Sequence, residues 1–282
     1  MTTRTLSASM VGLEVAAAVH TIDARWLMAY AAALGIEDAR YFDTQNAAGP
    51  LAHPLFAVCY EWPLALAVRD RVIGPDIAPF GVHATHALTI HRPPRAGDTL
   101  HTSARVIAAE PRRAGTLVTV RFTTRDTGGA AVTTTDYGSL YRGVALAEPG
   151  GSAPPREQAA AAPGEAVWQE PLAIAAGAAH VYTECARIWN PIHTDIAVAR
   201  AAGLPALILH GTATLALAVS RVMARQAGND GRRVRAVQAR FTGMVVMPST
   251  LTVRGHAARD GAIAFDALAA GGARVLQGAL SL

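Results

Sequence analysis

The chain of 282 residues contains no lysine and only two cysteines, Cys59 and Cys185. All 25 basic residues are therefore arginines, and with 21 acidic residues they give a net charge of +4 without a dense basic run. This balance argues against a nucleic acid partner. Both cysteines lie inside predicted helices, where buried and reduced thiols are expected, and this indicates a cytoplasmic protein rather than a disulfide-stabilised secreted one.

Long apolar runs are also missing. Residues 1–15 contain no apolar segment of signal-peptide length, and the apolar stretches further along are too interrupted to span a bilayer. The composition is 51% hydrophobic and 16% charged, and 282 residues can bury one large core or two of ordinary size. We therefore expect a globular chain, with neither membrane insertion nor disorder.

The most informative stretch is 182–217. Ala-rich residues 176–187 favour a helix, and the proline after Asn190 excludes the α conformation there, so the helix has to end before it. His193 is then displayed in a turn. Asp195 is expected to cap the short helix that follows rather than to take part in catalysis.

A second segment brings a backbone donor to the same region. His210-Gly211 opens a long apolar helix that is predicted to run to about residue 227. Gly211 has no Cβ and lies at the helix start, where its N–H and the positive end of the helix dipole can face a ligand oxygen. The two segments together predict an imidazole, a side-chain amide and a free N–H close to one another.

The order N-P-I-H-T-D, then G-L-P, then H-G before an apolar helix resembles the MaoC-like family of (R)-specific enoyl-CoA hydratases and 3-hydroxyacyl-thioester dehydratases, which have the hot dog fold. In that family an aspartate and a histidine handle a water molecule, and a glycine N–H binds the thioester oxygen. The resemblance places the histidine on His193, the motif's asparagine on Asn190 and the oxyanion donor on Gly211.

The family aspartate falls on Ile188, which has no acid or base chemistry. Glu184 lies one helical turn earlier on the same face and is an auxiliary catalytic candidate, displaced by about 6 Å along a regular helix. A salt bridge between Glu184 and Arg187 is the other interpretation of this residue.

Five further side chains are candidates for substrate binding. Tyr182 and Trp189 either line an acyl tunnel or pack in the core. His210 is expected to contact the substrate beside Gly211. Arg232 and Arg233 form either a phosphate site for coenzyme A or a solvated turn.

Residues 22–43 match residues 174–195 at a constant offset of 152, with five identities, and this suggests two copies of one unit. The first copy has Tyr41 in place of His193, and Asp38 in place of the asparagine, so we expect it to have kept the scaffold and lost the chemistry. The predicted divisions are an N-terminal unit at 1–145 with a degenerate site, a Pro/Gly/Ala-rich linker at 146–164, and a C-terminal unit at 165–282.

Each unit is expected to place helices before an antiparallel meander, which is an α+β order. In the first unit the pattern predicts an edge strand at 11–20, a helix from residue 22 to about 35, an apolar helix at 53–68 kinked or cut at Pro63, and strands at 82–91, 98–109, 116–125 and 131–142. In the second it predicts a strand at 166–172, a helix from about 176, and strands at 233–243, 250–258, 262–269 and 273–281. The resemblance identifies each unit as a hot dog, an antiparallel sheet wrapped around a long helix, so the chain is a fused pseudo-dimer that acts as a monomer or a homodimer.

Strand 82–91 contains three histidines, His83, His86 and His91. Strict alternation along a strand directs His86 away from the other two, and no cysteine or acidic ligand is nearby in the sequence. We therefore predict no metal site, and no cofactor is implied by the resemblance.

Three hypotheses for function remain open. The first is a hydratase or dehydratase that interconverts an enoyl thioester and a 3-hydroxyacyl thioester, carried by coenzyme A or by an acyl carrier protein. The second is other acyl-thioester chemistry on the same scaffold, such as hydrolysis or isomerisation. The third is a catalytically silent acyl-binding subunit, which the substitution at Ile188 allows.

Overall fold

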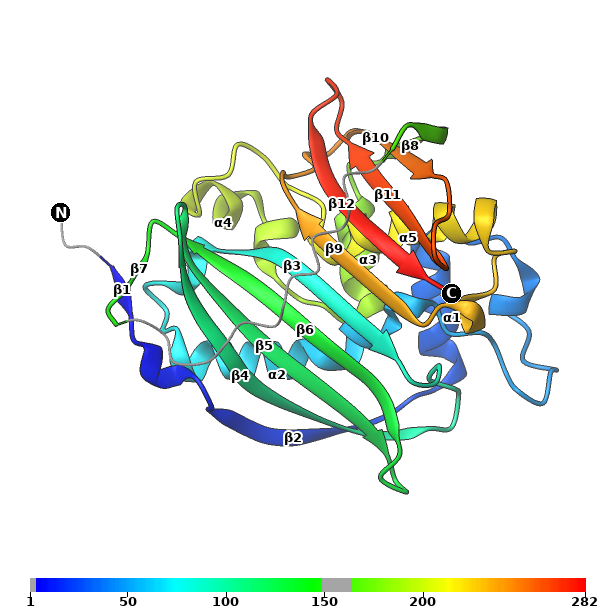
Figure 1. The fold of residues 1–282 in the computed structure, drawn as a ribbon, viewed down its shortest axis with the longest axis horizontal. Helices are drawn as coiled ribbons and strands as arrows, with labels where there is room; N and C mark the ends of the chain where they lie inside the picture. The colour runs from blue at the N-terminus through cyan, green and yellow to red at the C-terminus, as the bar shows by residue number, and fades with distance from the viewer. Residues whose placement is uncertain (1–3, 149–163) are drawn as a thin grey trace.

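A computed structural model describes residues 4–148 and 164–282 of the chain. Ten strands form one antiparallel sheet in front of the helices in Figure 1, in the order β2-β4-β5-β6-β3-β9-β12-β11-β10-β8. The first five are β2 (Glu14–Thr21), β4 (Thr99–Arg112), β5 (Gly115–Asp126), β6 (Ala131–Arg142) and β3 (Gly81–Ile90). The other five are β9 (Ala236–Phe241), β12 (Arg274–Ser281), β11 (Ala262–Leu268), β10 (Ser249–His256) and β8 (Ala166–Ile174). A parallel pair, β1 (Thr5–Leu6) with β7 (Ala145–Leu146), stands apart from this sheet.

The two halves have the same topology. In each, the first strand in the sequence pairs with the third, and the strand order from the outer edge is first, third, fourth, fifth, second. The second strands of the halves, β3 and β9, pair with each other at the centre through Thr85 with Arg240 and Thr89 with Ala236. The predicted α+β class with two fused units is therefore confirmed. Most of the predicted linker, residues 149–163, lies outside the described residues.

The helices lie on one side of the sheet and repeat in the same way. In the first half they are α1 (Ala24–Ala33), α2 (Ala57–Val72), η1 (Ala8–Met10), η2 (Ala39–Tyr41), η3 (Pro54–Phe56) and η4 (Ala78–Phe80). In the second half they are α3 (Ala178–Ala186), α4 (Ile196–Ala201), α5 (Gly211–Gln226), η5 (Pro191–His193) and η6 (Gly231–Arg233). Pro63 lies inside α2, which is not cut in two. The predicted cut at Pro63 is therefore absent, and the long helix begins at Ala57, directly after η3.

The core lies between the sheet and the long helices. Helix α5 buries residues on most of its surface, including Leu215, Val219 and Val222, which are 0% exposed. Tyr30 of α1 and Tyr182 of α3, which are equivalent at the offset of 152, meet with their hydroxyl oxygens 3.4 Å apart. This contact places the approximate two-fold axis that relates the halves between α1 and α3.

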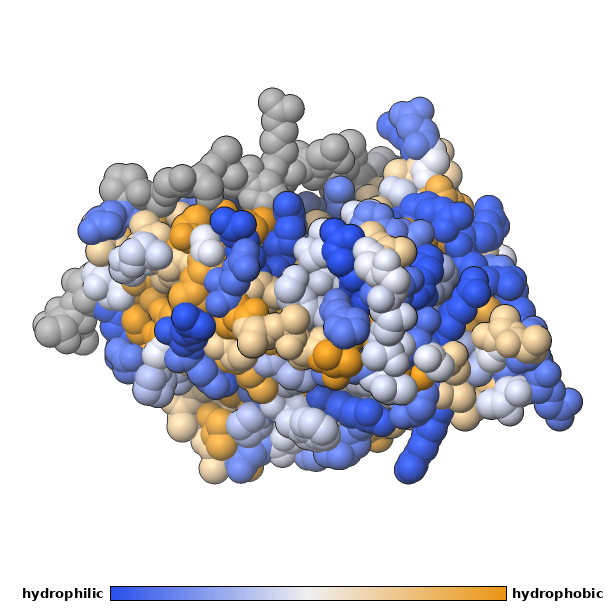
Figure 2. Space-filling model, turned by 90° about the horizontal axis from the view of Figure 1, so that it is seen from below, coloured by the Kyte–Doolittle hydropathy of each residue, from blue (hydrophilic) through white to orange (hydrophobic). Residues whose placement is uncertain are grey.

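The surface carries most of the charged residues. Seen from below, it is largely hydrophilic, and apolar residues gather mainly toward one end (Figure 2). Among the described residues, no helix is both long enough and apolar enough to cross a membrane.

Candidate active site

His193 ends the short η5 helix and is 8% exposed. Asn190 has an extended backbone, as the following proline requires, and this turns the chain away from α3. The Nδ1 atom of His193 lies 2.9 Å from the carbonyl oxygen of Ile208. Because a carbonyl oxygen only accepts, Nδ1 carries the proton and Nε2 presents its lone pair. Among the described residues, Nε2 has no hydrogen-bond partner of its own.

Burial keeps this imidazole uncharged. It lowers the pKa of His193 to about 4, and the bond to the Ile208 carbonyl opposes that shift only in part. His193 is therefore neutral at physiological pH, and its free nitrogen can accept a proton from water.

His210 connects this turn to the start of α5. Its ring stacks on the His193 ring, with centroids 3.7 Å apart, and its Nε2 lies 3.1 Å from Thr183 Oγ1 on α3. Burial lowers its pKa to about 2, and the neighbouring His193 contributes in the same direction. His210 is thus neutral, and it packs against His193 at the position that directly precedes the helix.

Gly211 is the first residue of α5, and no side chain caps this helix end. A Cβ at this position would lie 3.4 Å from Phe241 Cε1 and 3.5 Å from His83 Nδ1. The backbone at Gly211 is therefore closely approached by one side chain from each half of the molecule. A thioester oxygen bound to this N–H would also be favoured by the dipole of the 16-residue helix.

Three predicted residues of the turn occupy different surroundings. The Asn190 side chain is half-buried and does not cap η5. Ile188 is 3% exposed and packs in the main core, so the position of the family aspartate holds an apolar side chain. Asp195 caps α4 by accepting from the N–H of Ala197 at 2.8 Å, as predicted.

Glu184 is exposed on α3. No ion pair between it and Arg187 is present in the described part of the chain. Arg187 instead lies 3.6 Å from an Asp23 carboxylate oxygen and stacks on the Trp26 ring at 4.1 Å. The salt bridge considered for Glu184 is thus replaced by one that joins the two halves.

The aromatic candidates differ in burial. Tyr182 is 1% exposed, and its hydroxyl donates to Thr212 Oγ1 at 3.1 Å. Thr212 is the residue that follows Gly211. Trp189 is 58% exposed, so its ring lies on the surface beside Asn190 rather than in the core.

Arg232 and Arg233 are exposed in η6, which packs against the degenerate turn of the first half. Arg232 pairs with Asp230 at 2.7 Å, and Asp230 also lies 3.8 Å from Arg40. Arg233 donates to the Ala227 carbonyl oxygen at 3.2 Å.

The degenerate turn itself is filled by the chain. The Tyr41 hydroxyl donates to the Asn229 carbonyl oxygen at 3.4 Å. Asp38 accepts from the Asn229 amide at 2.9 Å and pairs with Arg40, whose hydrogen bond lowers the Asp38 pKa to about 2. These contacts occupy the groups that correspond to the candidate catalytic side chains His193 and Asn190 of the second half.

The sequence missed His83 as a neighbour of Gly211. A β-bulge shifts the register between β3 and β6, so that His83 pairs with Ser139 and Thr85 with Gly138. The bulge directs His83 and His86 to the same side, with ring centroids 5.4 Å apart. The expectation that these two histidines point to opposite faces is therefore wrong. Within residues 4–148 and 164–282, no three His, Cys, Asp or Glu side chains are grouped as metal ligands.

Family models match both halves of the chain. The family model of the MaoC like domain matches residues 158–267, which include both the turn and the helix start. The second half is a MaoC-like domain. The first half matches the FAS1-like, dehydratase domain region over residues 9–135. The resemblance inferred from the turn and the H-G pair is thereby confirmed at the level of the family.

Curated relatives match the chain over short segments. The fatty acid synthase subunit beta of Aspergillus oryzae is 42% identical over 76 residues, which is 26% of this chain and 4% of that protein. The peroxisomal multifunctional enzyme type 2 of Drosophila melanogaster is 42% identical over 64 residues, or 23% of this chain and 11% of the enzyme. These matches therefore represent small parts of much longer proteins.

Solved structures share the fold over nearly the whole chain. A MaoC-like dehydratase from Phytophthora capsici is 22% identical with a TM-score of 0.80, and 97% of this chain covers 96% of it. The Drosophila enzyme is 23% identical with a TM-score of 0.75, and the match covers 95% of this chain and 48% of the enzyme. A conserved protein of Mycobacterium tuberculosis described as a double hot dog is 19% identical with a TM-score of 0.63, covering 96% and 95% of the two chains. The MaoC-like domain is thus the second member of a fused hot dog pair.

Proposed function

We propose that the protein is a hydratase or dehydratase that interconverts an enoyl thioester and a 3-hydroxyacyl thioester of coenzyme A or of an acyl carrier protein. The hydrogen bond from His193 Nδ1 to the Ile208 carbonyl supports this most directly, because it leaves a neutral Nε2 lone pair on a ring that stacks on His210, the residue before α5. The MaoC-like family and its dehydratase relatives support the reaction class. The assignment of an enoyl or 3-hydroxyacyl thioester as the substrate is part of this proposal.

In the hydration direction, His193 Nε2 takes a proton from water as the water oxygen bonds to the β-carbon. The electron pair of the double bond moves toward the thioester oxygen, where the Gly211 N–H stabilises the developing charge. Asn190 orients the water. Proton transfer by a positioned imidazole is typically worth about 10²- to 10⁴-fold in rate.

The same imidazole completes the reaction. Because burial lowers the pKa of His193 to about 4, its protonated form is more acidic than an ordinary imidazolium and returns the proton to the α-carbon. No second acid is then required at Ile188. Glu184, which is exposed, has an auxiliary role at most in this scheme.

The test follows the absorbance of the conjugated enoyl thioester with purified protein. Turnover that is lost in His193→Ala and kept in Asp195→Ala supports the proposal, since Asp195 only caps α4. Release of free coenzyme A without hydration would replace it with thioester hydrolysis.

A silent acyl-binding subunit is the second candidate. The observation in its favour is the buried, apolar Ile188 at the position of the family aspartate. Binding of acyl-CoA with no turnover of short or long enoyl esters would establish that function instead.

A further inference from the structure

The β3 bulge creates a pair of histidines that the proposed reaction does not use. A Cβ on Gly138 would lie within van der Waals overlap of Thr85 Oγ1, so only glycine fits opposite the bulge. His83 and His86 are turned inward together, and His86 is 1% exposed. Two imidazoles are thereby enclosed next to the centre of the molecule.

Their nitrogens are not satisfied by the described part of the protein. His83 Nε2 lies 3.1 Å from the Thr85 carbonyl oxygen, so it carries the proton and leaves Nδ1 as an acceptor. His83 Nδ1 and both nitrogens of His86 are buried without a hydrogen-bond partner. Buried polar groups rarely stay unpaired, and this pair therefore indicates a bound polar group.

The pair adjoins the proposed thioester site. His83 Nδ1 lies 3.5 Å from the point where a Cβ on Gly211 would stand. The His83 ring stacks on Tyr137 at 4.0 Å and contacts Phe241 at 4.4 Å between centroids. We call the group of side chains formed by His83, His86, Tyr137 and Phe241 the histidine recess.

Among the residues that the structure describes, the two histidines of the recess have no charged partner. Burial lowers the pKa of His86 to about 4 and raises that of Glu61, which accepts from Thr135 on β6, to about 8. Arg69 acts on the Tyr137 hydroxyl and is not among the groups that shift the pKa of His83 or His86. An uncharged group therefore loses less on entry between the two histidines than a carboxylate would.

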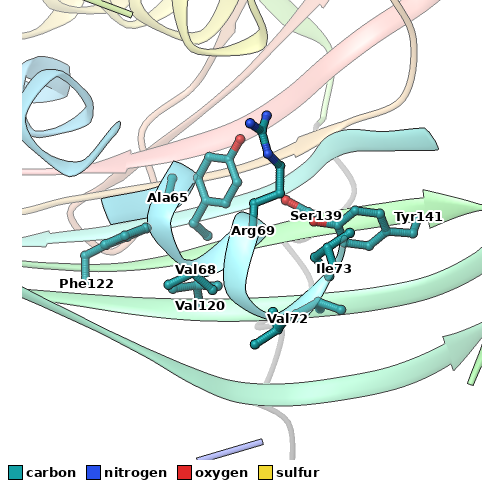
Figure 3. A pocket seen from close by; sticks show the side chains of 11 residues that line it. Ala65, Val68, Arg69, Val72, Ile73, Val120, Phe122, Ser139 and Tyr141 are labelled. Atoms are coloured by element: carbon teal, nitrogen blue, oxygen red, sulfur yellow. The ribbon is translucent and has the colours of Figure 1, made fainter. Parts of the chain in front are cut away.

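The space beyond is small. Tyr137 also lines a cavity of about 30 Å³ between α2 and the sheet, surrounded mostly by apolar side chains such as Val68 and Phe122 (Figure 3). Such a volume holds a group the size of a water molecule. Because His83 Nδ1 lies 3.5 Å from the Cβ position of Gly211, a chain of only a few carbons spans the distance from a thioester at Gly211 to the recess.

We propose that the histidine recess binds the hydroxyl group of a short hydroxyacyl chain whose thioester is held at Gly211. A hydroxyl can donate to His83 Nδ1 and accept from His86 N–H at the same time, whereas a carbonyl only accepts and an ammonium only donates. This inference rests on the proposed function for the position of the thioester. The hydroxyl belongs to the far end of the acyl chain, not to the carbon that is hydrated.

Calorimetry on the full chain tests the recess without turnover. The probes are saturated acyl-CoA esters of four to six carbons, each compared with the ester that carries a terminal hydroxyl. We expect one hydroxylated ester to bind roughly 3- to 30-fold more tightly than its plain partner, the range of one or two buried neutral hydrogen bonds. His86→Leu should reduce that ratio to about one. His91→Leu, at an exposed position directly after the end of β3, should keep it.

The outcomes separate the two proposals. Equal binding of plain and hydroxylated esters at every length means that the recess holds water only and overturns the inference, even if enoyl esters are hydrated. A binding preference without any hydration upholds the recess and rejects the proposed reaction. Failure of every ester to bind overturns the recess as a ligand site. The comparison in the unmodified protein decides the question if His86→Leu does not fold.

Discussion

Glu61→Gln should make the protein more stable, and increasingly so as the pH rises. Glu61 lies on α2, is 3% exposed and accepts a 2.6 Å hydrogen bond from Thr135 Oγ1. Burial raises its pKa from 4.5 to about 8, and the threonine hydrogen bond offsets this only in part. The amide oxygen of glutamine can accept the same bond without any ionisation.

Proton linkage gives the direction and the size of the change in the free energy of unfolding. The folded pKa is above the unfolded one, so the contribution of Glu61 to stability is fully present below pH 4.5 and is lost as the pH rises to about 8. Each pH unit in that window is worth about 1.4 kcal/mol. Between pH 5 and pH 8, the advantage of Glu61→Gln in the free energy of unfolding should therefore grow by about 4 kcal/mol.

Urea denaturation followed by circular dichroism at pH 5, 6, 7 and 8 gives this difference directly. Glu184→Gln is the matched control, because it removes the same charge from an exposed position and should stay within about 0.5 kcal/mol of the unmodified protein. A difference for Glu61→Gln that does not change with pH would refute the reasoning and mean that the carboxyl ionises within the fold.

Three other outcomes test the site. His193→Ala should lower the rate of enoyl thioester hydration by about 10²- to 10⁴-fold with an unchanged KM, measured by steady-state kinetics; an equal rate would exclude His193 as the base. Gly211→Ala should fold normally, because its Cβ would meet only ordinary contacts at 3.4 to 3.6 Å. It should nevertheless slow turnover, because the methyl group narrows the approach of the substrate to the N–H. Thermal melting checks the fold and steady-state kinetics check the rate, and full activity would contradict the prediction. Burial lowers the pKa values of His53 to about 3 and of His86 and His193 to about 4, so the unfolded state binds more protons below pH 6.5. The free energy of unfolding, measured by urea titration, should therefore fall between pH 6.5 and pH 4. A free energy that stays constant over that range would contradict the burial of these rings as neutral groups.

The local chemistry of the turn could be predicted because it depends on neighbouring residues. α3 ends at Ala186, before the proline that follows Asn190, Asp195 caps α4, and α5 begins at Gly211, each as expected. These features follow from backbone sterics and the unpaired N–H groups of a helix start, which the sequence displays directly.

The neighbours of the turn could not be predicted in the same way. The orientation of His86 depends on a bulge that requires Thr85 of β3 to fit against Gly138 of β6, two residues that are far apart in the sequence. Alternation along one strand gives no sign of such a register shift. The ion-pair partner of Arg187 could not be predicted either, because Asp23 belongs to the other half of the molecule.

The filled turn of the first half shows what a covalent fusion permits. When two identical chains pair, a substitution alters both of their sites at once. Here the Tyr41 and Asp38 side chains form hydrogen bonds with Asn229. His83, from that same half, stands at the glycine where α5 begins in the other. One half can therefore line the proposed binding site, while the proposed reactive groups, His193 and Gly211, belong to the other half.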